Sequence, residues 1–175
     1  MHNKITWLLL ISALLLITLV PGGPIENRDF SHLSPLLLST FNLFLTTLGL
    51  GSLMAAYFVR LHARWAIVAG MLAGISYFIV YLLDLARMFP VSPTPMPLLL
   101  ELIEIAGLIL SLPTMYWCLK VLTKTSLMNE EPAMELHTRS PLSVFLLACC
   151  IVVVGLMVVI FATLAAMGRL PGWFM

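Results

Sequence analysis

The sequence predicts an all-α integral membrane protein built as a bundle of five transmembrane helices. Hydrophobic residues make up 61% of the 175 residues and charged residues only 10%, whereas about a quarter of the residues of a soluble domain are charged. Apolar runs long enough to cross a hydrocarbon core of about 30 Å recur along the chain and are separated by short polar segments. We therefore expect residues 1–175 to form a single membrane domain surrounded by the lipid bilayer.

The first two helices are expected at about 5–20 and 35–59. The first apolar run follows Lys4, stops before Pro21, and is intermediate in length between a signal-peptide core and a full span. Two interpretations remain, a cleaved signal peptide and a retained helix, and the lack of a small-residue cleavage site favours retention. Ser34-Pro35 supplies an N-cap and a first-turn proline for the second helix.

The remaining three helices are expected at residues 65–87, 97–119 and 141–168. The third starts at Trp65, a residue type that concentrates at membrane interfaces, and the prolines between residues 88 and 97 then prevent regular helix. Residues 120–140 form the longest polar segment and are expected to be a cytoplasmic loop. Ser140-Pro141 then begins the last helix.

Basic residues predict how the bundle is oriented. Placing the N-terminus in the cytoplasm puts six Lys and Arg residues inside and three outside, in agreement with the positive-inside rule. The C-terminus is then external, and cleavage of the first helix would leave four helices with the same orientation. The short loops and the lack of a large soluble domain favour a bacterial plasma (inner) membrane.

Small and polar residues mark the faces that are expected to pack. Gly70, Gly74, Tyr77, Tyr81 and Asp84 lie on one stripe of the third helix. The Gly70–Gly74 pair is a GxxxG motif, which permits close helix approach within the chain or, less commonly in a multi-span protein, between chains. Similar stripes on the second and fifth helices are expected to meet this face.

Seven polar residues are expected near the outer ends of the helices. They are Asn42, Tyr77, Tyr81, Asp84, Arg87, Glu101 and Glu104. A charge at the centre of a spanning helix costs roughly 2.5–3.5 kcal/mol, so Glu104, about two turns into its helix, needs a partner or water. Arg87 is the expected partner. Three carboxylates against one arginine leave a net negative site, which favours cationic ligands.

Two interpretations of this site remain open. In the first, Arg87 pairs with Asp84 or Glu101, Glu104 hydrogen-bonds to Asn42 or a tyrosine, and the set only locks the helices together. In the second, it is an outward-facing pocket for a cation, a proton or a small polar solute, in which the protonation of Glu104 changes on binding. The polar segment 21–34 lies above it as a lid or, more commonly for such a segment, a solvated loop.

Several chemistries are not indicated. All four histidines fall outside the predicted spans, which disfavours haem, and no Glu-x-x-His pair suggests a diiron site. No hydrolase or phosphate-binding motif is present, and the basic residues are scattered, so no catalytic residue, metal, cofactor or nucleic-acid partner is expected.

Three classes of function remain. The first is binding or transport of a small cationic or polar solute or of protons. The second is a non-catalytic accessory or assembly subunit of a larger membrane complex. Besides the lipid bilayer, the expected partners are further copies of the chain, as a homo-oligomer, or a partner membrane subunit. The third is a membrane enzyme that acts on lipid or quinone.

Overall fold

The computed structural model describes residues 1–21, 25–26, 28–128 and 141–168, which form five helices and no strands. The helices are α1 His2–Thr18, α2 Pro35–Arg60, α3 Arg64–Leu85, α4 Leu98–Met128 and α5 Pro141–Ala166. Three of them, namely α2, α3 and the Leu98–Lys124 part of α4, are long and apolar enough to cross a membrane. The predicted all-α class is therefore confirmed, and three of the five expected spans have the length and apolar character that a membrane crossing needs.

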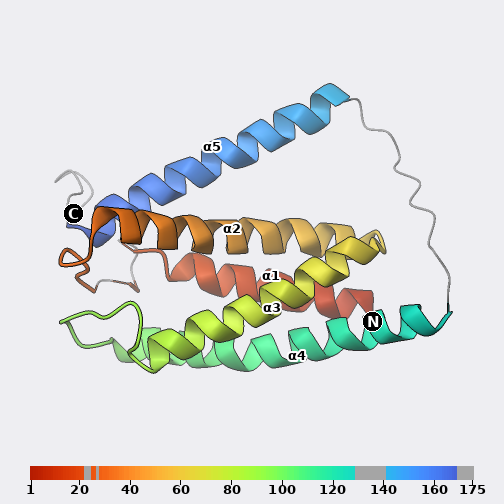
Figure 1. The fold of residues 1–175 in the computed structure, drawn as a ribbon, viewed down its shortest axis with the longest axis horizontal. Coiled ribbons are helices and arrows are strands. Elements are labelled where there is room, and N and C mark those ends of the chain that lie inside the picture. The colour runs from red at the N-terminus through yellow and green to blue at the C-terminus, as the bar shows by residue number, and fades with distance from the viewer. Residues whose placement is uncertain (22–24, 27, 129–140, 169–175) are drawn as a thin grey trace.

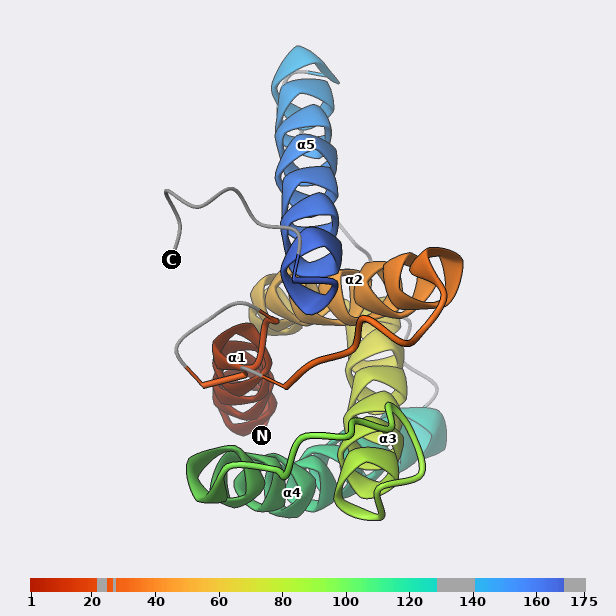
Figure 2. The same ribbon diagram turned by 90° about the vertical axis from the view of Figure 1, so that its left-hand side faces the viewer.

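Successive helices run in opposite directions, so their ends gather at two poles of the molecule (Figure 1). Helices α1 to α4 form a bundle in which α1 contacts each of the other three. Among the described residues α5 packs on α2 alone, and it diverges from α2 towards its own N-terminal end (Figures 1 and 2). The small-residue face of α5 meets α2, because a Cβ atom on Gly155 would lie 3.4 Å from Cδ1 of Leu50 and 3.8 Å from Cγ2 of Thr46. Helix α2 also contacts α3, but among the described residues α5 does not, so the three stripes do not all meet on one face.

The GxxxG face of α3 packs inside the bundle. A Cβ atom on Gly70 would lie 3.2 Å from Cδ1 of Leu9 in α1, and one on Gly74 would lie 3.0 Å from Cγ of Met115 in α4. These contacts explain why α5 does not reach α3, because α1 and α4 already cover the glycines. The motif therefore brings helices of one chain together.

Local sequence explains most helix ends. Ser34 Oγ accepts a hydrogen bond from the Leu37 N–H at 3.3 Å and so caps α2, which starts at Pro35. At the end of α3, the Arg87 N–H donates to the Asp84 carbonyl at 2.8 Å while Arg87 takes a left-handed backbone with φ 54°. Helix α3 consequently ends at Leu85, before the predicted residue 87.

Helix α4 continues to Met128, although a loop is expected from residue 120. The first predicted loop residue, Lys120, keeps its ammonium group 5.2 Å from the ring centre of Trp117 and 5.6 Å from that of Tyr116. No glycine or proline interrupts the chain between Pro113 and Met128, so polarity alone did not end the helix. The rest of the predicted loop, residues 129–140, lies outside the described residues.

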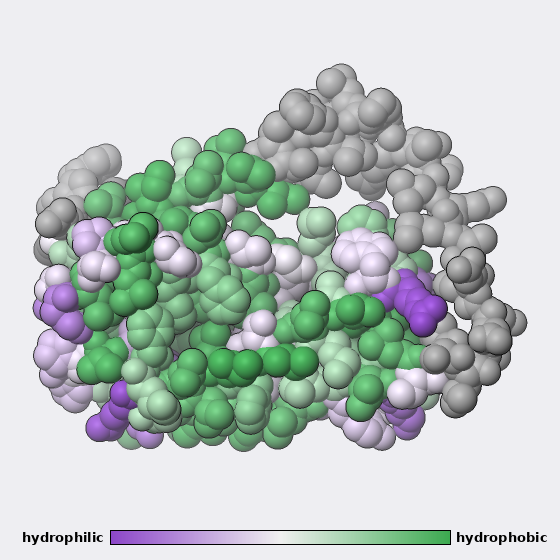
Figure 3. Space-filling model, viewed as in Figure 1, coloured by the Kyte–Doolittle hydropathy of each residue, from purple (hydrophilic) through white to green (hydrophobic). Residues whose placement is uncertain are grey.

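The outer surface has the character of a lipid-facing protein. In Figure 3 hydrophobic residues cover the middle of the molecule along the helices, and hydrophilic residues gather towards the two poles. Large apolar side chains such as Trp7, Leu72 and Ile109 are at least 60% exposed. Such a broad apolar surface is stable in lipid and not in water.

Candidate functional site

Arg28 lies at the centre of a buried group of charged side chains. It belongs to the segment between α1 and α2, yet it is only 8% exposed. Its guanidinium donates two hydrogen bonds to Asp84 at the end of α3, from Nη1 to Oδ1 at 2.7 Å and from Nη2 to Oδ2 at 2.7 Å. This bidentate geometry is the strong form of an arginine–carboxylate pair.

The same guanidinium also binds Glu26. Nε donates to Oε1 at 3.0 Å and Nη2 donates to Oε2 at 2.6 Å. Burial of Arg28 disfavours its charged form, but the hydrogen bonds to Asp84 and Glu26 more than offset this and raise the pKa of the guanidinium above its ordinary value. Arg28 is therefore a permanent cation that holds two carboxylates.

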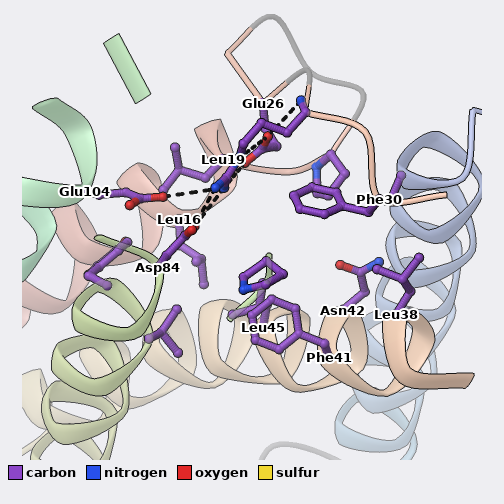
Figure 4. Close-up of a pocket in the computed structure, with 16 residues that line it drawn as sticks. Leu16, Leu19, Glu26, Phe30, Leu38, Phe41, Asn42, Leu45, Asp84 and Glu104 are labelled. Atoms are coloured by element: carbon purple, nitrogen blue, oxygen red, sulfur yellow. Dashed lines mark hydrogen bonds and ion pairs between the residues drawn. The ribbon is translucent and has the colours of Figure 1, made fainter. Parts of the chain in front are cut away.

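Glu104 is the third carboxylate of this group and has no such partner. It lies on α4 and is 2% exposed, and its Oε1 is 3.8 Å from Nη2 of Arg28, which is too long for a hydrogen bond. Its Oε2 has no hydrogen-bond partner among the described residues. Figure 4 shows Glu26, Asp84 and Glu104 converging from three parts of the chain. We call Glu26, Arg28, Asp84 and Glu104 the carboxylate cluster.

Two of the expected site residues lie outside the carboxylate cluster. Arg87 is exposed, and the structure pairs Asp84 with Arg28 in its place. Glu101 is also exposed although Glu104 is buried. Two residues that are three positions apart on a helix are rotated by about 300°, which leaves their side chains about 60° apart around the axis. The two glutamates therefore share a face only approximately, and Glu101 lies nearly one turn closer to the start of α4.

The other three expected residues are all buried, but only some of them lie beside the carboxylate cluster. Tyr81 lines the same cavity, and its hydroxyl has no hydrogen-bond partner in the described part of the chain. Asn42 donates to Thr163 of α5 at 3.2 Å, and Tyr77 donates to Ser52 of α2 at 3.0 Å. Tyr81 thus belongs to the site, whereas Asn42 and Tyr77 mainly connect helices.

The segment before α2 covers the site. The Asp29 N–H donates to Thr94 Oγ1 at 3.2 Å, and the Phe30 N–H donates to the carbonyl of Ala166 in α5 at 3.2 Å. Asp29 itself is exposed, and the hydrogen bond from the Ser31 N–H lowers the pKa of its carboxyl. The segment is therefore not an entirely solvated loop, because Glu26 and Arg28 point inward while Asp29 stays in solvent.

Two spaces adjoin the carboxylate cluster. A cavity of about 40 Å³ lies among Glu26, Arg28, Tyr81, Asp84 and Glu104. It has room for a few water molecules, since one water needs roughly 10–15 Å³ measured in this way. A larger pocket of about 290 Å³ lies under the α3–α4 connection and is lined by Arg28, Asp84 and Arg87.

The donor geometry limits what the cluster can bind. Within the described ranges, no three His, Cys, Asp or Glu side chains are arranged to hold a metal ion. With every carboxylate ionised, three negative charges face one positive charge. A proton, or an N–H group of a cation, can satisfy the open oxygen of Glu104 without a full set of metal ligands.

Comparison with known proteins gives a family and no activity. No curated protein and no solved structure matches the chain. The model of a family described as a domain of unknown function, DUF8051, matches residues 1–135. These residues include α1 to α4 and the whole carboxylate cluster, whereas α5 lies beyond them. The chain therefore belongs to the DUF8051 family.

Proposed function

We propose that this protein binds and releases a proton at Glu104 as part of the transport of a small cationic solute across a membrane. The observation that carries the proposal is the open Oε2 of Glu104 in a side chain that is 2% exposed. The nearest nitrogen of the neighbouring guanidinium, Nη2 of Arg28, lies 3.8 Å from Oε1 of Glu104 and already donates to both Glu26 and Asp84. A buried carboxylate without a hydrogen bond or counter-charge is costly, and a bound proton removes the charge whereas a bound cation pairs with it.

We further propose that all five helices span the membrane, with the N-terminus in the cytoplasm and the C-terminus outside, in a bacterial plasma membrane. Lys4 and Lys120 lie at the pole opposite the carboxylate cluster, where both approach the ring of Trp117, at 4.3 Å and 5.2 Å from its centre. The α2–α3 turn, flanked by Arg60 and Arg64, lies at the same pole (Figure 1). Aromatic side chains are enriched at membrane interfaces and basic side chains on the cytoplasmic side, which supports a cytoplasmic position for this pole and an outer position for the cluster.

Infrared difference spectroscopy of the protein in lipid nanodiscs tests proton binding. The wild type should show a carboxylic-acid C=O band that appears and disappears reversibly with pH, and Glu104→Gln should lack it. Glu101→Gln, which changes an exposed glutamate on the same helix, should keep the band. Identical spectra for the wild type and a folded Glu104→Gln protein, with folding checked by circular dichroism, would disprove the proposal.

The accessory-subunit function is a second candidate, and one observation favours it. Helix α5 diverges from α2 and leaves a groove on the side of the bundle (Figure 1), and a helix of another membrane protein could fill such a groove. A native mass spectrum of the protein extracted in mild detergent decides between the two: a stoichiometric partner chain supports the subunit function, and a chain alone or in a homo-oligomer supports the first proposal.

A further inference from the structure

The groove between α1, α2 and α5 has a volume of about 540 Å³, which is within the range of roughly 300–1,000 Å³ typical of ligand pockets. Its lining is apolar apart from two side chains, Asn42 and Thr46. Leu50 of α2 and Met157 and Phe161 of α5 form part of its walls. Because α5 diverges from the bundle (Figure 2), the groove lies on its lipid-facing side.

The groove adjoins the carboxylate cluster. Five residues line both the groove and the small cavity at the cluster, namely Leu16, Leu19, Pro21, Asn42 and Leu45. Four of them are labelled in Figure 4, with Leu16 and Leu19 close to the converging carboxylates and Asn42 and Leu45 on α2. A charged group at the end of an apolar chain in the groove would therefore have to pass between these shared side chains into the small cavity, which Glu104 and Tyr81 line.

We infer that the groove binds a hydrophobic cation, an ammonium group attached to an apolar chain, with its charged end at Glu104. The inference rests on the proposed function, since the same carboxylate binds the proton and the cation. The cluster has three carboxylates and one guanidinium, so it attracts a cation and repels an anion. Glu104 Oε2 and the Tyr81 hydroxyl, both without partners among the described residues, are acceptors for the ammonium N–H groups.

Other occupants fit the groove and the cluster less well. A neutral acyl chain fills the groove but leaves Glu104 without a partner. The phosphate of an anionic lipid meets a net negative cluster, and a hydrated inorganic cation gains nothing from apolar walls. Because the ammonium group and the proton compete for Glu104, cation binding should weaken as the pH falls.

The test measures binding of radiolabelled dodecylammonium to the full-length protein in immobilised nanodiscs, with empty nanodiscs as background. Unlabelled dodecanol and dodecyl sulfate, which have the same chain with a neutral or an anionic end, serve as competitors. We expect saturable binding that dodecylammonium displaces and the other two do not. Equal displacement by all three would overturn the inference, because it would show a site for any apolar chain.

Two pairs of variants locate the site. Thr46→Trp fills the groove, whereas Thr47→Trp places the same ring on the adjacent exposed position of α2, away from the groove. Glu104→Gln removes the acceptor, and Glu101→Gln is its exposed control. Thr46→Trp and Glu104→Gln should each weaken binding by at least about tenfold, and both controls should bind as the wild type does.

The infrared band separates failure of this inference from failure of the proposed function. Thr46→Trp should keep the Glu104 band while losing cation binding, because the groove is not needed for the proton. A wild type that shows the band but binds dodecylammonium no better than Glu104→Gln would overturn the cation site alone. A wild type without the band would overturn the proposed function, and a partner chain whose helix occupies the groove would overturn the inference.

Discussion

At the residue scale, the main finding is that one arginine connects the chain segments at the pole where α3 ends. Arg28 connects the segment before α2 to the end of α3 by binding Asp84, which is 56 positions away in the sequence. Its pKa is raised, so the stabilisation from its charge is complete below the pKa of an unfolded arginine and is lost only above the folded value. The ion pair between Arg28 and Asp84 is therefore not lost through deprotonation of Arg28 at any pH at which proteins normally work.

Replacement of Arg28 by Gln should reduce the free energy of unfolding by about 3–5 kcal/mol, because it leaves buried carboxylates without a counter-charge. Arg87→Gln changes the exposed arginine nearby and should cost no more than about 0.5 kcal/mol. Equilibrium unfolding in mixed micelles of mild detergent and dodecyl sulfate measures both. Equal losses for the two variants would contradict the central position of Arg28.

The sequence predicted some of these residues and missed others for a physical reason. Asp84 and Glu104 are recognisable because acids inside membrane helices are costly and rare. Arg87 is the nearest arginine along the chain, but its left-handed backbone ends α3 and its side chain is exposed. Helix periodicity says nothing about a connecting segment, so Arg28 was not identified as the partner. The apolar Phe30 beside it, which is buried, was the available signal that this segment packs inward.

At the scale of single elements, helix contacts depend on a few small residues. The ring of Tyr81 in α3 lies directly on Gly107 of α4, where an added Cβ would be only 2.4 Å from Cε2 of the ring. The glycine thus lets α3 and α4 approach closely and positions the Tyr81 hydroxyl beside the carboxylate cluster.

Gly107→Ala should lower the free energy of unfolding by about 1–3 kcal/mol, because the buried ring must move to make room. Gly51→Ala is the matched control, since that position is exposed and an added Cβ meets nothing within 4 Å. It should be neutral or stabilise by up to about 1 kcal/mol through better helix propensity. Thermal unfolding in one detergent compares them, and a neutral Gly107→Ala would contradict this packing.

The elements themselves follow closely from the sequence, because apolar runs, the Ser34 cap and the prolines define most helix boundaries. The end of α4 did not follow, since polar residues without glycine or proline continue a helix as well as apolar ones do. The position of α5 was predictable only in part. Its small residues, such as Gly155, identify the face that contacts α2, but a stripe does not show which further helix it meets, so the lack of a described contact with α3 did not follow from the sequence.

At the scale of the whole molecule, the two poles differ in the charged groups and connections that they contain. One pole carries the carboxylate cluster and the α3–α4 connection, and the other carries the N-terminus and the α2–α3 turn (Figure 1). The proposed orientation places the first pole outside the cell and the second in the cytoplasm.

Cysteine labelling should show this orientation directly. In a background with Cys118, Cys149 and Cys150 replaced by serine, a membrane-impermeant maleimide should label Val91→Cys, which is exposed in the α3–α4 connection, in intact cells. Leu61→Cys, which is exposed in the α2–α3 turn, should react only after the cells are permeabilised. The opposite pattern would reverse the topology.

The most direct single measurement is carbodiimide labelling of the wild-type protein in lipid, followed by mass spectrometry of its peptides. A hydrophobic carbodiimide reaches carboxyl groups from the bilayer and reacts with those that carry a proton. The buried, proton-binding Glu104 should acquire the label and exposed Glu101, in the same peptide region, should not. A label on Glu101 alone, or none on Glu104 at any pH at which the protein is folded, would contradict the proposal that Glu104 is the proton site.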